Sequence, residues 1–224
     1  PHMLAHHRPW PLPRAPWIAR MVWEKLLFIH WPLDPAALRP LIPRALAIDT
    51  FDGRAWIAVV PFTMTIAPRG APFPPLRRAF HELNVRTYVT VDTPRGPRPG
   101  VWFFSLDCAD PFSVRTARAA GLPYFNARMS MTESADGAIT YHSRRTHTGA
   151  PEARLEMTYH PTGPAHINTD GTLESWLTER YCLYCPAMTA RRAADLQAQT
   201  PELVEAVGVR ATSVRRETGS CESG

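Results

Sequence analysis

The chain has 224 residues, of which 45% are apolar and 20% charged, and its net charge is +5 at neutral pH. This balance is ordinary for a globular protein, and a chain of this length can bury a core without disulfides, so we expect a single domain over residues 1–224. The arginines are scattered and form no basic run, so the positive charge does not indicate a nucleic-acid partner.

Three further features of the composition limit the chemistry and the location. Lys25 is the only lysine, so a mechanism that needs an amine nucleophile has one candidate side chain. Four cysteines without a signal peptide are typical of free thiols in a cytoplasmic protein. No apolar stretch approaches the ~20 residues of a membrane helix, so we expect no membrane partner. The opening residues Pro1-His2-Met3 are typical of a cloning remnant.

The N-terminal third begins with an irregular arm over residues 1–20. The apolar run Trp23 to Trp31 follows and favours one strand buried on both faces, although periodicity alone does not exclude a helix. Asp34 before Pro35 then predicts a short capped helix from Asp34 to Arg39.

Strand signals dominate after this helix. Residues 46–51 and 55–62 flank Asp52-Gly53, which predicts a hairpin between them. The second strand extends to residue 66 only if Pro61 lies at an edge or a bulge. Residues 67–79 hold four prolines and predict a loop.

The second half continues as strands with short helices. A helix within 111–120 should end at Gly121, a normal position after a helix end. The remaining expected elements are strands at 83–91 and 101–106 around a turn at 92–100, a hairpin of 124–132 with 138–145, a strand at 153–160, a helix at 173–177, helical pieces over 187–209 and a frayed tail over 210–224. About eight to ten strands with two or three short helices indicate a mainly β (α+β) fold, either a curled antiparallel sheet or a β-barrel.

Several blocks resemble the YqjF-like family of uncharacterised bacterial proteins. They span Trp23 to Tyr184 and read WEKLLFIHWPLDPAALRPLIP, DTFDGRAWIAVVPFTM, FHELNVRTYV, GVWFFSLD, GLPYFNARM and LESWLTERYCLY. The family is grouped by fold with acetoacetate decarboxylase. The resemblance therefore implies a barrel-like sheet around a small apolar pocket, and it allows a homo-oligomer because that fold often forms multimers.

The resemblance to the decarboxylase fails at its reactive lysine. That enzyme carries a glycine-aromatic-proline-lysine-lysine motif whose first lysine forms a Schiff base. The matching stretch here is Gly121-Leu122-Pro123-Tyr124-Phe125, with aromatic residues at both lysine positions. A phenol cannot form an imine, and Lys25 belongs to a different strand, so Schiff-base chemistry is not expected.

The C-terminal region departs from the family pattern. After the CLY segment, relatives usually continue with a strand and a Pro-Trp-Pro-Leu element and close with another strand. Residues 186–224 show neither and are rich in alanine, arginine and glutamine. This region is either a divergent variant or the product of a frame change.

Polar residues within the strand at 83–91 and just before it are the main site candidates. Glu82, Asn84 and Arg86 alternate and should point to one face. The resemblance matches Glu82 to a decarboxylase glutamate, so Glu82 is a candidate acid–base carboxylate, with Arg86 and Asn84 binding an anionic ligand. The alternative is a structural ion pair on a solvated face.

Four other residues are candidates, each with a structural alternative. His30 is a neutral general base or a satisfied core histidine. Tyr124 donates a hydrogen bond to a ligand carbonyl or enolate, or fills the space that the lysine left. Glu179 and Arg180 form a ligand clamp or a structural salt bridge.

Metal and cofactor signals are weak. Cys182 and Cys185 form a lone CxxC, and His142 and His147 have poor metal-ligand spacing, so we expect neither a metal nor a cofactor.

Two functions stay open. The first is a pocket that binds or transforms a small organic acid or carbonyl compound by lyase, isomerase or hydratase-type acid–base chemistry. The second is a non-catalytic interaction module with a filled barrel.

Overall fold

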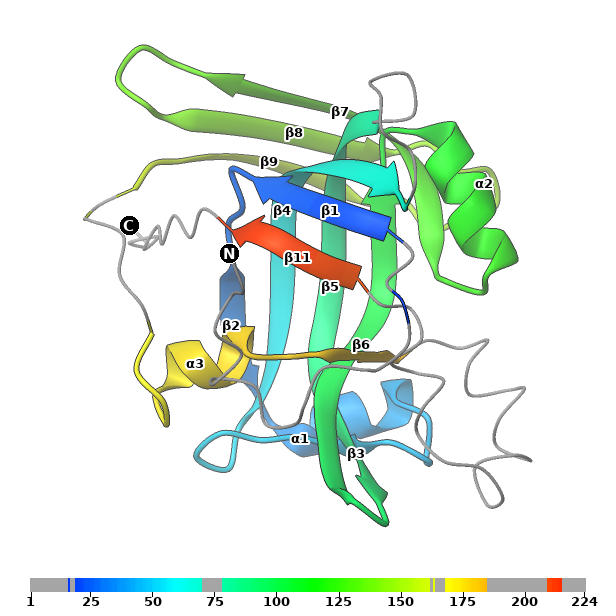
Figure 1. The fold of residues 1–224 in the computed structure, drawn as a ribbon, viewed down its shortest axis with the longest axis vertical. Coiled ribbons are helices and arrows are strands. Elements are labelled where there is room, and N and C mark those ends of the chain that lie inside the picture. Colours follow the sequence, from blue (N-terminus) through cyan, green and yellow to red (C-terminus); the bar gives the residue numbers. More distant parts are fainter. Residues whose placement is uncertain are drawn as a thin grey trace.

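The computed structural model describes residues 16, 19–69, 78–161, 163, 168–184 and 209–214, the last as backbone only. Residues 187–208 of the helical region predicted over 187–209, most of the N-terminal arm and the end of the predicted tail lie outside these residues, whereas Val209 begins a strand. The described chain forms strands with a few short helices (Figure 1). The strands are β1 (Ala19–Glu24), β2 (Ile29–Leu33), β3 (Ala47–Ile48), β4 (Ala55–Pro68), β5 (Arg78–Thr93), β6 (Gly96–Cys108), β7 (Tyr124–Glu133), β8 (Ile139–Arg145), β9 (Arg154–Tyr159), β10 (Cys182–Tyr184) and β11 (Val209–Val214). The helices are α1 (Pro35–Leu38), the 3-10 turn η1 (Arg39–Leu41), α2 (Pro111–Ala119) and α3 (Leu173–Thr178).

All described strands belong to one sheet, which confirms the mainly β class. Its main path runs β11-β1-β4-β5-β6-β7-β8-β9, with β2, β3 and β10 attached to β4, β5 and β6. Three pairs are parallel, namely β1 with β11, β6 with β7 and β6 with β10, so the purely antiparallel sheet was wrong. The helix α2 between β6 and β7 provides the crossover that a parallel pair needs. The path ends at β11 and β9, which do not pair, so the described strands close no barrel.

The single strand predicted over Trp23 to Trp31 is two strands. Lys25 has a φ of 53°, in the left-handed region, and this residue ends β1 before β2 begins. Both strands pair with the same side of β4.

The gap between β1 and β2 explains how Pro61 is tolerated inside the sheet rather than at an edge. Its carbonyl accepts from the Leu27 amide, so its missing N–H points to the same gap between the two strands.

The predicted turn at Asp52-Gly53 is confirmed, but the hairpin around it is wrong. Both residues have positive φ, as a tight turn of this type requires. Only Phe51 and Arg54 bridge across it, whereas β3 pairs with β5. The β5–β6 turn is also shorter than the predicted 92–100, because β6 already begins at Gly96.

The helix boundaries follow the capping signals. The side chain of Asp34 accepts from the Ala36 amide, and Asp110 accepts from that of Ser113. Thr172 caps α3 in the same way. These contacts satisfy amides that a helix start leaves without a partner, and they confirm the three predicted helices.

The C-terminal prediction needs a correction. Residues 209–214 form β11, which runs parallel to β1, so residues 210–214 are not a frayed tail and the region does supply a further strand. The signal was missed because a short strand that pairs only with the distant β1 carries no local turn or hairpin pattern.

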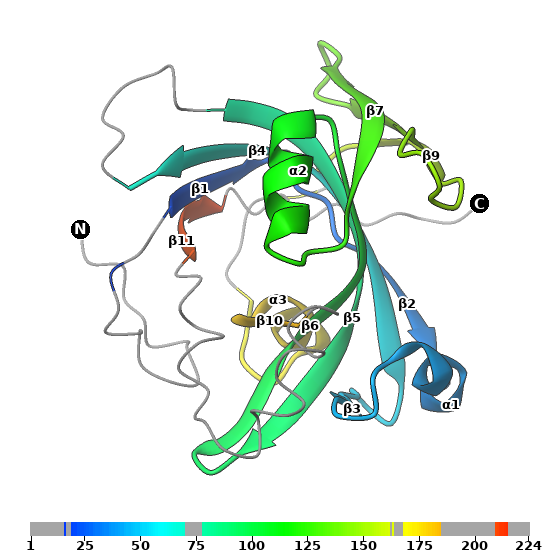
Figure 2. The same ribbon diagram turned by 90° about the vertical axis from the view of Figure 1, so that its right-hand side faces the viewer.

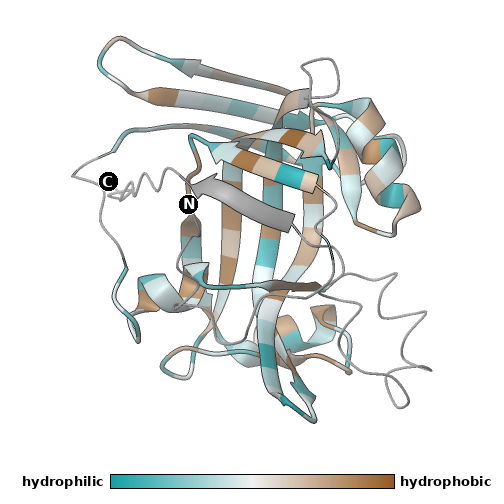
Figure 3. Cartoon of the chain, in the orientation of Figure 1, coloured by the Kyte–Doolittle hydropathy of each residue, from teal (hydrophilic) through white to brown (hydrophobic). Residues whose placement is uncertain are grey.

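The sheet curves and is covered on both faces (Figure 2). On one face, which we call the inner face, Val114 of α2 and Leu177 of α3 lie in one core cluster with the apolar β4 side chains Ala58, Val60, Phe62 and Met64. On the other, the β7-β8-β9 layer covers Leu83 with Ile139, Tyr141 and Tyr159. Hydrophobic and hydrophilic residues accordingly alternate along the strands (Figure 3). None of the helices within the described ranges is long and apolar enough to span a membrane.

Candidate functional site

Four polar or aromatic side chains of β5 form a row on the inner face, which we call the β5 row. It consists of Glu82, Asn84, Arg86 and Tyr88, at every second position of the strand. The first three pair in register with Phe62, Val60 and Ala58 of β4, so the predicted shared face is confirmed. Glu82 is 3% exposed and Asn84 5%. The alternative of an ion pair on a solvated face is therefore wrong.

Glu82 is a buried carboxyl held by hydrogen bonds. The Tyr124 hydroxyl donates to its Oε2 over 2.9 Å. Burial raises the pKa of Glu82 to about 8, and hydrogen bonds from Tyr124 and Asn84 oppose that rise. Glu82 consequently keeps its proton at neutral pH. Tyr124 is the first residue of β7. It reaches Glu82 because β7 runs parallel to β6, and β6 in turn pairs with β5.

His30 lies beside the other end of the β5 row. Its Nε2 is 2.7 Å from the Tyr88 hydroxyl, and its ring stacks on Phe28 with centroids 5.9 Å apart. Burial lowers the pKa of His30 to about 4, with a smaller contribution from the nearby positive charge of Arg86. The imidazole is therefore neutral at physiological pH, the state that the general-base hypothesis requires.

Two guanidinium groups flank the Tyr88 ring. The carbon of the Arg86 guanidinium is 5.9 Å from that ring centroid, and that of Arg180 is 5.1 Å. The guanidinium carbon of Arg180 also lies 4.1 Å from the ring centroid of Trp176, a residue of α3, which ends two residues before Arg180. Arg180 forms an ion pair with Asp49, and its side chain is only 4% exposed.

The expected Glu179–Arg180 pair is replaced by two other contacts. Arg180 pairs with Asp49, whereas Glu179 accepts a hydrogen bond from the Tyr181 hydroxyl. Sequence reasoning missed Asp49 because 131 positions separate it from Arg180 and no motif joins them. Tyr88 could have been predicted as a site residue from the sequence, since it continues the alternation that identified the other residues of the β5 row.

The charges of this group do not cancel. Arg86 and Arg180 carry two positive charges against the single negative charge of Asp49, because Glu82 and His30 are neutral at pH 7. Burial, and to a smaller extent the charge of Arg86, lower the pKa of Arg180, while Asp49 opposes this. Among these described groups, one positive charge has no negative partner. Leaving a partly buried charge uncompensated is costly, so this arrangement favours an anion.

Several buried polar atoms near these charges have no hydrogen-bond partner in the described part of the chain. Two are guanidinium nitrogens, Nε of Arg86 and Nη2 of Arg180. The others on this part of the inner face are Trp56 Nε1 and Asn84 Oδ1. Buried polar groups are nearly always hydrogen-bonded in proteins, so their gathering here marks a candidate binding site.

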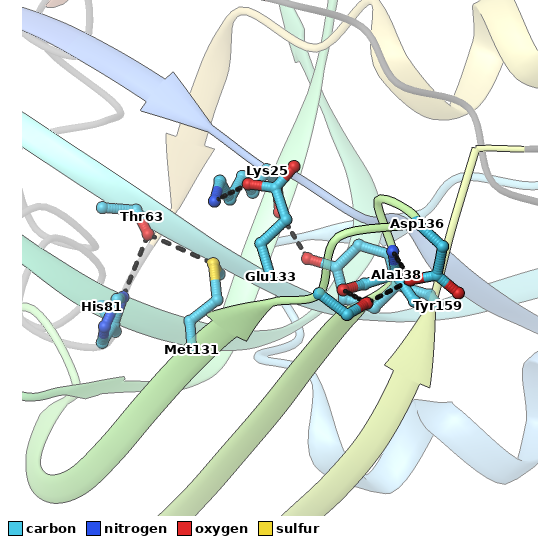
Figure 4. Close-up of polar contacts among 9 residues, drawn as sticks. Lys25, Thr63, His81, Met131, Glu133, Asp136, Ala138 and Tyr159 are labelled. Atoms are coloured by element: carbon cyan, nitrogen blue, oxygen red, sulfur yellow. Dashed lines mark hydrogen bonds and ion pairs between the residues drawn. The ribbon is translucent and has the colours of Figure 1, made fainter.

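Lys25 has no part in this group. Its Nζ pairs with Glu133, and its carbonyl accepts from the Tyr159 hydroxyl over 2.6 Å (Figure 4). Glu133 ends the strand that Tyr124 begins, which corresponds to about 30 Å of extended chain. The Lys25 side chain thus contacts the far end of the β7–β8 hairpin.

The weak metal signals gain no support within the described ranges. No group of three or more potential metal ligands occurs there. His142 lies 3.6 Å from Glu156, and Cys182 is buried in β10, whereas Cys185 is outside the described residues.

The fold and the site together define a mainly β protein with a curved mixed sheet, two arginines beside the Tyr88 ring and a protonated buried carboxyl on one face. The model of the DUF2071 family, described as an uncharacterized conserved protein, matches residues 20–212. The chain therefore belongs to this family. The match includes residues 186–212, which the sequence alone set apart as atypical.

One relative is the uncharacterized protein YqjF of Bacillus subtilis (strain 168). It is 43% identical over 175 residues, which cover 77% of this chain and 69% of YqjF. This likeness confirms the family resemblance read from the sequence blocks.

Solved structures of acetoacetate decarboxylase-like proteins are similar at a lower level. The enduracididine biosynthesis enzyme MppR, complexed with the condensation product of pyruvate and imidazole 4-carboxaldehyde, is 16% identical with a TM-score of 0.48; the match covers 67% of this chain and 60% of MppR. An acetoacetate decarboxylase-like enzyme from Sphingomonas wittichii RW1 is 19% identical with a TM-score of 0.45, over 66% of this chain and 58% of that one. The chain thus spans about three fifths of the length of these structures.

Proposed function

We propose that the inner face binds a small organic acid or carbonyl compound through Arg86 and Arg180. The single observation that supports this most is the positive charge left over beside Tyr88. Arg86 has no carboxylate partner within the described residues, and its Nε has no hydrogen-bond acceptor. A carboxylate would supply both the missing charge and the missing acceptors, because guanidinium and carboxylate form paired hydrogen bonds.

The chemistry open to this site is proton transfer. Glu82 holds a proton at neutral pH, and Tyr124 occupies only its Oε2. A protonated carboxyl of this kind can donate a hydrogen bond or a proton to a carbonyl or enolate oxygen. His30, neutral and bonded to Tyr88, is the second candidate for proton transfer. The reaction would be of the lyase, isomerase or hydratase type, without an imine.

The alternative is a non-catalytic interaction module with a filled barrel, which predicts Glu82, Arg86 and Tyr124 in solvent. The burial of Glu82 and Asn84 supports the ligand site over this alternative. A homo-oligomer, the cytoplasmic location and the single domain over residues 1–224 stay predictions.

A thermal-shift series with small keto, hydroxy and unsaturated acids tests the proposal. At ~100 times Kd, a ligand stabilises the fold by about 2.7 kcal/mol, which is a readable rise in Tm. The Arg86→Gln variant should lose this rise because it removes the charge and keeps the side chain polar. Arg115→Ala is the matched control, since it removes an exposed positive charge from α2.

The outcomes separate clearly. A rise in Tm that persists in Arg115→Ala and disappears in Arg86→Gln supports an anion site at Arg86. An equal loss of the Tm rise in both variants would show that the acids bind by general charge attraction and not at Arg86. If no acid shifts the wild type, the proposal fails and the interaction module is favoured.

A further inference from the structure

Strand β9 ends the main path of the sheet, and among the described strands it pairs only with β8 (Figure 1). Of the strands with a single partner and described side chains it is the longest, with six residues and no proline. β2 contains Pro32, and β3 and β10 have only two and three residues. A long open edge without proline is a template for a further strand, because its outward amides and carbonyls have no partner in the sheet.

The backbone groups on this open edge belong to Arg154, Glu156 and Thr158. The Arg145 amide donates to the Ala153 carbonyl over 2.9 Å, so these two residues form a hydrogen-bonded pair between β8 and β9. Hydrogen-bonded pairs alternate along an antiparallel ladder, so every second residue from Ala153 onward directs its backbone groups to β8. The residues between them direct theirs away from β8, where no described strand pairs with them.

The exposed side chains on the open edge carry opposite charges. Arg154 and Glu156 form an ion pair of 2.6 Å within β9, and their side chains are 70% and 52% exposed. Charges on an edge strand normally deter pairing with a second copy when like charges would meet. With Glu156 on the two-fold axis, the two Glu156 carboxylates would indeed meet. With Leu155 on the axis, Arg154 of each copy stands opposite Glu156 of the other.

We propose that β9 pairs antiparallel with β9 of a second copy of this chain, with Leu155 on the two-fold axis. Arg154 and Glu156 then form hydrogen-bonded pairs on both sides of the axis, so that the outward backbone groups and the opposite charges are satisfied together. The two Leu155 side chains meet at the centre, on the face where Leu155 packs against the apolar cluster of Ile139 and Tyr141. The pairing joins two β7-β8-β9 layers into one sheet and does not depend on the proposed anion site.

Charge reversal tests the contact on the full chain. Sedimentation velocity over a concentration series should show a monomer–dimer equilibrium. Arg154→Glu should raise the dimer Kd more than roughly tenfold, because it places two like-charge contacts in the interface. Adding Glu156→Arg to the same chain should restore the wild-type Kd, since each swapped charge again meets its opposite. Arg128→Glu is the matched control, because it reverses an exposed charge on β7, two strands from the open edge.

Cysteine cross-linking tests the register. Leu155→Cys should give a disulfide-linked dimer under mild oxidation, because facing residues of a non-hydrogen-bonded pair have Cα atoms about 4.5 Å apart, within the range of a disulfide. Met157→Cys should give none, because residue 157 stands opposite residue 153 of the other copy. The wild type with its four native cysteines is the blank.

The outcomes decide between pairing and its alternatives. A monomer at every concentration would overturn the proposal, and so would a dimer whose Kd is the same in Arg154→Glu. A cross-link at residue 157 and none at residue 155 would place Met157 on the axis and overturn the register. If Arg154→Glu fails to fold, the two cysteine variants still decide, because neither of them changes a charge.

Discussion

The hydroxyl of Tyr124 donates a hydrogen bond of 2.9 Å to the buried carboxyl of Glu82, across 42 residues of sequence. Tyr124 occupies the position that the family resemblance aligns with the lysine of the decarboxylase. Both groups keep their protons at neutral pH, because burial raises the pKa of Glu82 to about 8 and that of Tyr124 well above its usual range. Two neutral acids thus lie together at this position.

Replacing Tyr124 by phenylalanine should raise the pKa of Glu82 further, because the hydrogen bond that favours the carboxylate is lost. The fold should lose about 1 kcal/mol of stability. Carbon-13 NMR of labelled glutamate carboxyls over a pH series measures this pKa, and Glu82→Gln assigns the signal. Tyr141→Phe is the control, since the Tyr141 hydroxyl donates to the backbone carbonyl of Glu82 instead. An equal pKa change in both variants would contradict the prediction.

Glu82→Gln should make the protein progressively more stable than the wild type as the pH rises from about 4.5 to about 8. In this range the unfolded chain loses its Glu82 proton while the folded chain keeps it, so wild-type stability falls with pH. The slope for one group is at most about 1.4 kcal/mol per pH unit. Urea unfolding of both proteins at pH 5 and pH 7.5 measures it. A constant difference between the two proteins would show that Glu82 titrates normally.

Lys25 should not form an imine with a keto acid. Its Nζ pairs with Glu133, at the opposite end of β7 from Tyr124. Incubation with pyruvate and borohydride, followed by mass spectrometry of peptides, should therefore give no adduct on the Lys25 peptide beyond that of the unfolded chain. Lys25→Arg keeps the positive charge and serves as the blank. A stoichiometric adduct in the folded wild type alone would reopen Schiff-base chemistry.

Gly100→Ala should detach β10 from β6. A Cβ at this position would lie 2.5 Å from the carbonyl oxygen of Cys182 and 2.8 Å from the Tyr184 ring. Overpacking of this kind typically costs about 1–3 kcal/mol. Denaturant unfolding measures the loss, with Gly163→Ala as the control because no atom of the described residues lies within 4 Å of its Cβ position. Equal stability of the two variants would show that β10 shifts to accommodate the added methyl group without loss of stability.

Features set by neighbours in sequence were predictable. The caps at Asp34 and Thr172 and the turn at Asp52-Gly53 depend on a few adjacent residues, and all three are present. The alternation of Glu82, Asn84 and Arg86 likewise fixed their common face, since side chains alternate along any strand. The break at Lys25 was not predictable, because it depends on two separate strands pairing with one side of β4.

The amino-acid sequence alone places aromatic residues at 124 and 125, so neither position offers a lysine whatever the fold. It also fixes which residues of β5 share a face, because side chains alternate along any strand. Only the tertiary structure decided that Tyr124 meets Glu82 and that Arg180 meets Asp49 and Tyr88. Burial and charge pairing depend on residues far apart in the chain, so the protonated state of Glu82 and the excess positive charge become visible only once the sheet has formed.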